Sequence, residues 1–439
     1  MEQRRKNLTQ LFIPICLETL LYMLSGMVDT LMLSSVNDQA VGAVGTANTY
    51  IGIFIIMFSV ISSGMVAVMT QNIGADRPGV AYQARQLGLA FNAVLGVIMS
   101  LFLSLGAGII LSGVGVADAL MQPAKTYLQI VGGFCILNAL IPICSSYLRA
   151  FGFSKEPLYA SIIGNVINFC LNAFFLFVLH KGVAGVATAT VISRIINLVI
   201  VVLLGAVLVK AKQHPERESN RAVMGQIIRI GLPSACETAI YNVSMTLVIR
   251  FLNQMDAQGL NVTARSYTMQ ITNFSYCVGA ALAQANAIMT GWHIGAKEYD
   301  ACDRGTKKAA VIGVIVAVIL ETVFTLCSGW IMQLFSKDPQ MVSLVGKLLA
   351  IDIVLEIGRV TNLVYGQALK TSGDAVFPVV MGACFMILCS VGGTYLFGIR
   401  LGLLAVGAYI GMTGDECVRA VGMYLRWKSG KWKNKGLVD

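Results

Sequence analysis

The sequence predicts an all-α polytopic membrane protein, with twelve transmembrane helices that form two pseudo-symmetric six-helix bundles around a central cavity. Three observations lead to this fold class. Of the 439 residues, 56% are hydrophobic and only 12% are charged, whereas a soluble domain is about 25% charged. The apolar runs are about 20 residues or longer, as in membrane helices, and are not the roughly 10-residue alternating segments of a barrel. The two halves of the chain also repeat each other's motifs.

The apolar runs predict six spans on each side of a hydrophilic segment. The predicted spans are 9–35, 43–70, 86–113, 119–148, 157–179, 183–209, 225–252, 262–293, 309–335, 339–369, 375–398 and 402–425. The longest hydrophilic break, KAKQHPERESNRA, predicts a cytoplasmic linker at 210–222. It would join an N-terminal half at 1–209 to a C-terminal half at 223–426, and a basic tail would follow at 427–439. The first apolar run is too long for a signal peptide, so it predicts a spanning helix.

Basic residues set the predicted orientation, because cytoplasmic loops carry an excess of Lys and Arg. With both termini cytoplasmic, 22 of the 32 basic residues lie on the cytoplasmic side, and only Lys181, Lys337 and Arg400 lie in outside loops. This bias explains the net charge of +10 without a nucleic-acid partner. In the tail, Trp427 and Trp432 predict an interfacial anchor at the lipid headgroups. The expected location is the inner (plasma) membrane, crossed many times.

The internal repeat is the strongest indication of the architecture. The segment PICLETLLYMLS at 14–25 shares its Pro, Glu, Thr, Tyr and Ser with PSACETAIYNVS at 233–244. The segment LRAFGFSKEP at 148–157 matches LKTSGDAVFP at 369–378. Because each half holds six spans, the repeat is parallel, with an axis near the membrane normal. Such a pair of halves predicts a central cavity that can open to either side.

Common enzyme motifs do not occur in the sequence. It contains no GxxxxGK[ST] and no HExxH, and its 11 cysteines form no CxxC pair. ATP-driven pumping and zinc hydrolysis therefore have no motif to support them. We expect a protein that is not an enzyme and that needs no cofactor beyond a coupling ion.

The first span carries carboxyl groups on one helix face. Glu18, Tyr22, Ser25 and Asp29 follow one another at spacings of four, three and four, which places them on the same side of a helix. An ionisable group inside a membrane is energetically costly, so it normally faces a protein interior or a wet cavity. A proton or Na⁺ would neutralise a half-buried Asp29, so this residue is the main candidate for ion coupling. The alternative is a structural hydrogen-bond network.

Amide side chains on the fifth span extend this candidate site. Asn165, Asn168 and Asn172 lie in or near one helix face. Carboxylate and amide oxygens together suit a hard cation, although asparagines in membrane helices also serve as interhelical hydrogen-bonding groups.

Two repeat-related carboxyl groups predict a substrate cavity. Glu18 and Glu237 lie at equivalent places in the two halves, with Tyr22 and Tyr241 one turn further on. If the halves face each other, these groups would attract lipophilic cations through charge and cation–π contact. The alternative is hydrogen bonding at the helix ends.

Two further ionic pairs occur in the C-terminal half. Glu356 and Arg359 share a helix face at a spacing of three, and Asp415 and Arg419 at a spacing of four. Such pairs inside a membrane are more often structural than functional. We nevertheless include Glu356 and Arg359 among the predicted cavity residues.

An ordered set of motifs in both halves resembles the multidrug and toxic compound extrusion (MATE) family of transporters. The set comprises PICLE…VDTLMLS, AVGAVGTAN (40–48), IGA after the second and eighth spans, LRAFG…P, GNVINFCLN (164–172), GLPSACE…YN (231–242) and GDECVRA…RWKSGKWK (414–433). The resemblance implies two six-helix bundles around a V-shaped cavity, and efflux of organic compounds in exchange for entering Na⁺ or H⁺.

The resemblance also implies roles for single residues. Asp29 occupies the first-helix aspartate position tied to cation coupling, and Asn168 matches an asparagine of the N-terminal ion site. Asn172 stands where some members have an aspartate, and Arg359 stands where another branch has a cation-binding aspartate. Because Val248 is the repeat counterpart of Asp29, we place coupling in the N-terminal half.

These observations predict secondary active efflux of amphipathic, cationic organic compounds by antiport with Na⁺ or H⁺, with alternating access through rocking of the two halves. The expected partners are small organic substrates and the lipid bilayer, and the expected state is a monomer. The alternative is a flippase or exporter of a lipid-linked or amphipathic metabolite. A receptor or membrane enzyme would need an appended domain or a catalytic constellation, and the sequence shows neither.

Overall fold

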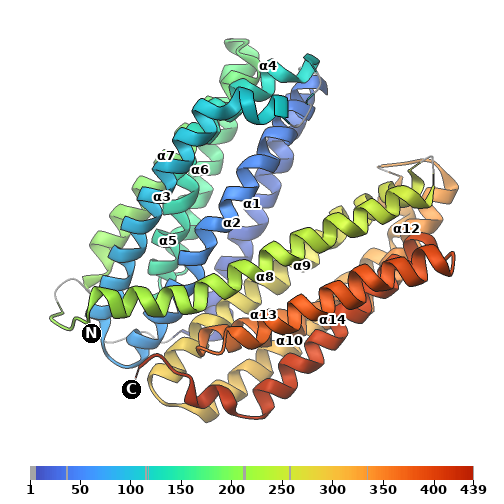
Figure 1. Cartoon of the computed structure of the whole chain (residues 1–439). Helices are drawn as coiled ribbons and strands as arrows, with labels where there is room; N and C mark the ends of the chain where they lie inside the picture. The colour runs from blue at the N-terminus through green and yellow to red at the C-terminus, as the bar shows by residue number, and fades with distance from the viewer. Residues whose placement is uncertain are drawn as a thin grey trace. The chain divides into compact units, whose positions relative to one another are not determined.

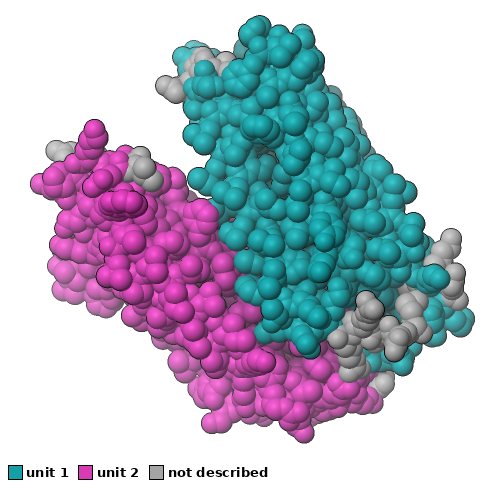
Figure 2. All heavy atoms as spheres, turned by 180° about the vertical axis from the view of Figure 1, so that it is seen from behind, with its two compact units in different colours: residues 1–232 teal, residues 233–439 magenta. Residues whose placement is uncertain are grey.

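The computed structural model describes residues 6–35, 38–113, 116, 118–210, 214–256, 259–333 and 335–438, with the side chain of Asp38 left out. These residues are almost entirely helical (Figure 1). The chain divides into two compact units, Met1–Leu232 and Pro233–Asp439 (Figure 2). We refer to them as unit 1 and unit 2, and describe each by itself.

Among its described residues, unit 1 contains six long helical segments, and the fourth and fifth of them each include a π-helical turn. The segments are α1 (Leu8–Ser34), α2 (Asp38–Gly74), α3 (Pro78–Gly113), α4 (Asp118–Tyr127) with the π-helix η1 (Leu128–Gly132) and α5 (Ile136–Ala150), α6 (Lys155–Ala173) with the π-helix η2 (Phe174–Val178), and α7 (Gly182–Leu208). Within the bundle α1 packs against α6, and α2 packs against α3 and α5.

Unit 2 repeats this plan. Its segments are α8 (Asn220–Met255, which begins in unit 1), α9 (Leu260–Gly295), α10 (Tyr299–Leu326) with the short α11 (Ser328–Met332), α12 (Pro339–Thr371), α13 (Val376–Phe385) with the π-helices η4 (Met386–Val391) and η5 (Thr394–Arg400), and α14 (Leu404–Lys428) followed by the 3₁₀-helix η6 (Lys431–Asn434). The central helix is α12, which packs against α9, α10 and α14.

The predicted twelve-span, two-bundle fold is therefore confirmed, with one local difference. The predicted span 119–148 is not straight, because its two parts meet at an angle of 43°. The break covers residues 133–135, directly after the π-helical turn of η1, so that Gly132 and Gly133 stand side by side at the bend. Glycine pairs and π-bulges are the usual causes of such a bend.

Charge is distributed unevenly over these helices. Among the described residues, seven helices are long and apolar enough to cross a membrane, or eight if the bent pair counts as one span. The long helices α8, α9, α12 and α14 are not among them. Three of them, α8, α12 and α14, carry several charged side chains, and α9 carries Arg265. Most of the buried charged residues among those described lie in unit 2.

The linker and the start of α8 pack against unit 1. Arg77 pairs with Glu218 at 2.6 Å, and Gln83 donates to the Glu218 carbonyl at 2.7 Å. The α8 backbone also approaches α2 closely, since a Cβ added at Gly231 would lie 1.7 Å from the Val60 carbonyl oxygen. Only glycine permits such an approach. The boundary between the units consequently falls inside α8, beyond the hydrophilic segment 210–222.

The tail does not form the predicted headgroup anchor. Trp427 and Trp432 are each only 1% exposed, and their rings stack with centroids 4.1 Å apart. The Trp427 indole donates to Asp303 at 2.9 Å, and the Trp432 indole donates to the Trp427 carbonyl at 2.9 Å. The prediction was wrong because both indole N–H groups find acceptors within unit 2, which allows full burial.

Asp374, in the loop after α12, binds the basic tail to the rest of unit 2. Arg426 donates to one oxygen of its carboxyl at 2.7 Å, and Lys435 to the other at 2.8 Å. Burial alone would raise the pKa of Asp374, but the two bases outweigh burial and hold that pKa below its ordinary value of 3.8. Since the pKa is lowered by folding, these contacts stabilise the tail fully above that value and weaken as the pH falls below it.

We expect Asp374→Asn to release the tail. The change removes two charge-assisted hydrogen bonds, worth about 1.5–3 kcal/mol each, so trypsin should cleave after Lys431 at least about tenfold faster at pH 8. The control is Asp300→Asn, which makes the same chemical change at an exposed position. Equal cleavage rates in the two variants would show that Asp374 does not hold the tail.

Candidate functional site

In unit 1 a polar cluster forms where α1 meets α6. Asn172 Nδ2 donates to Asp29 Oδ1 at 2.6 Å and to Asn168 Oδ1 at 3.2 Å. Asn172 is fully buried, and its own Oδ1 has no hydrogen-bond donor among the described residues. The structure thus brings three of the four predicted ion-coupling residues together and leaves an acceptor oxygen unpaired beside a carboxyl group.

Arg194 interacts with this cluster, and the fourth asparagine, Asn165, lies on the same helix as Asn168 and Asn172. Arg194 on α7 interacts electrostatically with Asp29, which partly compensates its charge. Asn165 is half-buried one turn before Asn168, and its Nδ2 has no partner within the part of the chain that is described. The Asn165 amide thus donates no hydrogen bond to Asp29 within these residues, and the hydrogen-bonded cluster consists of Asp29, Asn168 and Asn172.

The two repeat-related glutamates each form a salt bridge. Glu18 lies 2.5 Å from Arg149, and Glu237 lies 2.6 Å from Lys370. Arg149 and Lys370 are themselves counterparts in the repeat of 148–157 and 369–378. We call these contacts the twin bridges. They place a neutral ion pair at each position where the sequence analysis expected a free carboxyl group, because the repeat supplies a base together with each acid.

The two tyrosines predicted beside these glutamates are accessible. Tyr22 is 65% exposed and Tyr241 is 37% exposed, so both rings are free to contact a ligand. Tyr241 lines two adjoining pockets in unit 2, together with Tyr276 and Arg359. The first pocket also includes both members of the Glu237–Lys370 bridge.

An ionic network joins α12 and α14, and several of its side chains line these pockets. Arg359 Nη1 donates to Glu356, as the sequence spacing predicted, and Arg359 Nε lies 3.8 Å from Glu416. Arg419 donates to Asp415 at 2.8 Å and lies 2.9 Å from Glu416. Glu356 is completely buried and does not line either pocket, whereas Arg359 lines both.

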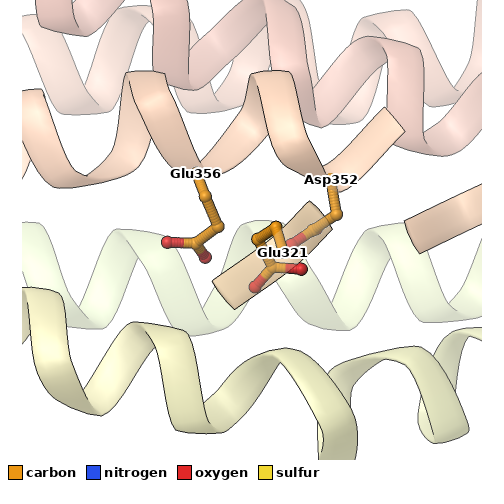
Figure 3. Close-up of side chains that lie close together, drawn as sticks. All are labelled: Glu321, Asp352 and Glu356. Carbon is orange, nitrogen blue, oxygen red and sulfur yellow. The ribbon is translucent and has the colours of Figure 1, made fainter. Parts of the chain in front are cut away.

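Further carboxyl groups reach the same region from α10 and from an earlier turn of α12. One oxygen from each of Glu321, Asp352 and Glu356 lies within 4.8 Å of the others. Figure 3 shows the Glu321 side chain beside Asp352, with Glu356 one turn further along α12. All three residues are at most 2% exposed.

Comparison with known proteins identifies the family. The family model described as MatE matches residues 14–174 and 233–396, one segment in each repeat half. The chain belongs to the MATE family. Its members are transporters, so this MATE protein is a multi-pass membrane transporter.

Several relatives and solved structures match this MATE protein over nearly its full length. It is 34% identical to the uncharacterized transporter YisQ of Bacillus subtilis, over 97% of this chain and 94% of YisQ. It is 23% identical to the probable multidrug resistance protein NorM of Thermotoga maritima, over 99% of this chain and 94% of NorM. A solved outward-facing multidrug resistance MATE transporter superposes with a TM-score of 0.87 at 18% identity, covering 97% of this chain and 95% of that one.

The sequence analysis of this MATE protein missed Glu321 and Asp352. Glu321 is the only charged residue in the apolar run AAVIGVIVAVILETVFTLC, which is the same signal that identified Asp29. Asp352 and Glu356 are spaced by four residues, so they share a face of α12. Both signals were available in the sequence, but the packing of α10 on α12 that joins them was not.

Proposed function

We propose that this protein exports amphipathic organic compounds, in exchange for H⁺ or Na⁺ that enters at Asp29. The observation that carries the proposal is the Asp29–Asn172–Asn168 cluster on two membrane helices. An aspartate with an unpaired amide oxygen beside it offers two acceptors to a proton or hard cation. Intramembrane carboxyl groups of this kind mark ion pathways in transporters. Membership of the MATE family supports the same assignment.

In this proposal the two six-helix units rock between states that expose the substrate to either side of the membrane. The protein acts as a monomer in the plasma membrane, with both termini in the cytoplasm, as the distribution of basic residues favours. The substrate class follows from the names of several relatives, which are probable multidrug resistance proteins, and from the accessible rings of Tyr22 and Tyr241.

A specific observation supports a second candidate. The pocket of unit 2 contains Lys370, Arg359 and Arg419 as well as Glu237 and Glu416. Both of these acidic groups are paired with a base, so the lining does not present a net negative charge to a cationic drug. A lining of this kind suits an amphipathic metabolite or lipid with a zwitterionic or anionic head group, which a flippase of related architecture would carry.

Transport in everted vesicles tests both candidates. We expect vesicles that contain the protein to accumulate ethidium when either an acidic lumen or a Na⁺-loaded lumen supplies the gradient, and to stop when an ionophore collapses that gradient. Vesicles without the protein are the control. If neither gradient drives ethidium uptake, export of organic cations is wrong, and accelerated transbilayer movement of a fluorescent phospholipid would then support the second candidate.

A further inference from the structure

Arg265, on α9, is a buried base that forms no salt bridge with any of the described residues. It is 5% exposed. Its Nη2 contacts the sulfur of Met245 at 3.7 Å, and its Nε has no hydrogen-bond partner within the described part of the chain. A thioether is only a weak acceptor, so it does not compensate a guanidinium charge. A buried charge in this state is energetically costly unless a counter-ion reaches it.

Arg265 lines a pocket in unit 2 with a volume of about 210 Å³. Residues of α8, α9, α12 and α14 form its walls. Because an apolar cavity of about 150 Å³ can hold benzene, this pocket has room for one aromatic ring with a small substituent. Ordered water can satisfy the N–H groups of a buried arginine, but it does not supply the missing negative charge.

The lining of this pocket is rich in aromatic rings and thioethers. It includes Tyr241, Tyr276, Tyr409, Met245, Met269 and Met412. Tyr276 and Met269 are 42% and 44% exposed, so part of the wall is accessible to a ligand. Tyrosine faces and polarisable sulfurs both make favourable contacts with an aromatic ring.

The other charged residues of the pocket limit the charge of a ligand. Asp352 interacts electrostatically with Arg359, and Arg359 also pairs with Glu356 and Glu416. Arg359 is therefore compensated, whereas Arg265 is not. A ligand with one negative charge can pair with Arg265, but Asp352 would repel the second charge of a phosphate dianion.

Arg265 also has no basic counterpart in the other half of the repeat. The alignment that pairs Asn72 with His293 places Val44 opposite Arg265. The shared six-helix architecture thus does not require a base at this position, which favours a role that belongs to unit 2 alone.

We propose that this pocket binds an aromatic monocarboxylate. The carboxylate pairs with the planar guanidinium of Arg265, which suits its geometry, and the ring lies against the tyrosines. Met245 is a flexible side chain and gives way to the carboxylate. The inference rests on the proposed function for the export of such a compound, and it extends the substrate class to aromatic organic anions.

Binding of benzoate to the purified protein tests the proposal without any transport step. Benzoate carries one carboxylate on one ring, and benzyl alcohol is its neutral match. We expect equilibrium dialysis in detergent at pH 7, with the uptake by empty micelles subtracted, to show one saturable site per chain for labelled benzoate and none for benzyl alcohol. Acetate, which lacks the ring, should compete at least about tenfold more weakly than unlabelled benzoate.

Arg265→Gln should weaken benzoate binding at least about tenfold, because it removes the charge-assisted hydrogen bonds to the carboxylate. Arg265→Lys keeps the charge but not the planar fork, so its affinity should lie between the two. The matched control is Arg250→Gln, which makes the same chemical change at an exposed position of unit 2 and should bind benzoate like the wild type. The comparison of benzoate with benzyl alcohol needs no variant, so it stands even if Arg265→Gln fails to fold.

Three results would overturn the inference. The first is a wild-type protein that binds no benzoate, or that binds benzyl alcohol equally well. The second is unchanged benzoate binding by a folded Arg265→Gln protein. The third is displacement of benzoate by acetate or chloride as effectively as by benzoate itself, which would mean that any small anion occupies the site. A failure of ethidium transport would contradict the proposed function but leave these binding results unaffected.

Discussion

Asp29→Asn is expected to reduce gradient-driven ethidium uptake to the level of vesicles without the protein, a loss of at least about 100-fold, or roughly 2.7 kcal/mol. The substitution removes the only carboxyl group of the unit 1 cluster. An asparagine side chain can still accept the hydrogen bond that Asn172 donates at 2.6 Å, so the packing of α1 on α6 should be preserved. The measurement is initial uptake rate under a pH gradient and, separately, under a Na⁺ gradient.

The control for this prediction is Asp76→Asn. Asp76 is exposed in the same unit and has a φ of 58°, a conformation that asparagine also adopts readily. Vesicles that contain the Asp76→Asn protein should take up ethidium at the same rate as those with the wild type. Full activity of Asp29→Asn under both gradients would instead place coupling outside the unit 1 cluster, and Glu237 and Glu356 would be the next residues to change.

Arg419→Met is expected to lower the stability of unit 2 by about 3–5 kcal/mol. Arg419 is 3% exposed and donates to Asp415 at 2.8 and 2.9 Å. It also pairs with Glu416 at 2.9 Å. Removal of the arginine leaves two buried carboxylates without their main partner, and the energy needed to bury unpaired charge dominates the effect. In detergent the unfolding temperature should fall by roughly 10 °C.

A triple variant separates the charge effect from the loss of packing. Combining Arg419→Met with Asp415→Asn and Glu416→Gln removes acids and base together, so most of the lost stability should return. Arg400→Met is the matched single control, because Arg400 is exposed and its loss should cost within about 0.5 kcal/mol. If the triple variant is as unstable as the single one, unpaired charge is not the cause.

The fold could be predicted from the sequence because membrane helices leave long apolar runs that do not depend on tertiary context. The structural features that could not be predicted are those that depend on contacts between segments far apart in the sequence. Nothing in the hydrophilic run 210–222 shows that α8 continues across the boundary of the two units. The Gly231–Val60 approach that holds its first turns on unit 1 is visible only when the helices are packed. The same holds for Trp427, whose acceptor Asp303 lies on α10.

The candidate site, like the fold, could be predicted only in part from the sequence. A carboxyl group in an apolar span identified Asp29, and helical periodicity identified Asn168 and Asn172 as neighbours on one face. Which base pairs with Glu18 was not predictable, since it depends on the end of α5 reaching α1. The acidic cluster of unit 2 likewise requires the register between α10 and α12, which sequence spacing within one helix cannot supply.

The twin bridges bear on the history of the chain. Each unit has a glutamate after a proline on its first helix, joined to a base at the end of its fourth helical segment. An acid and a base in matching places in both halves point to inheritance from one ancestral six-helix protein that was later duplicated. Asp29, which has Val248 as its counterpart, then records divergence after the duplication. On this account the ion pair belongs to the shared architecture, whereas each half acquired its other charges separately.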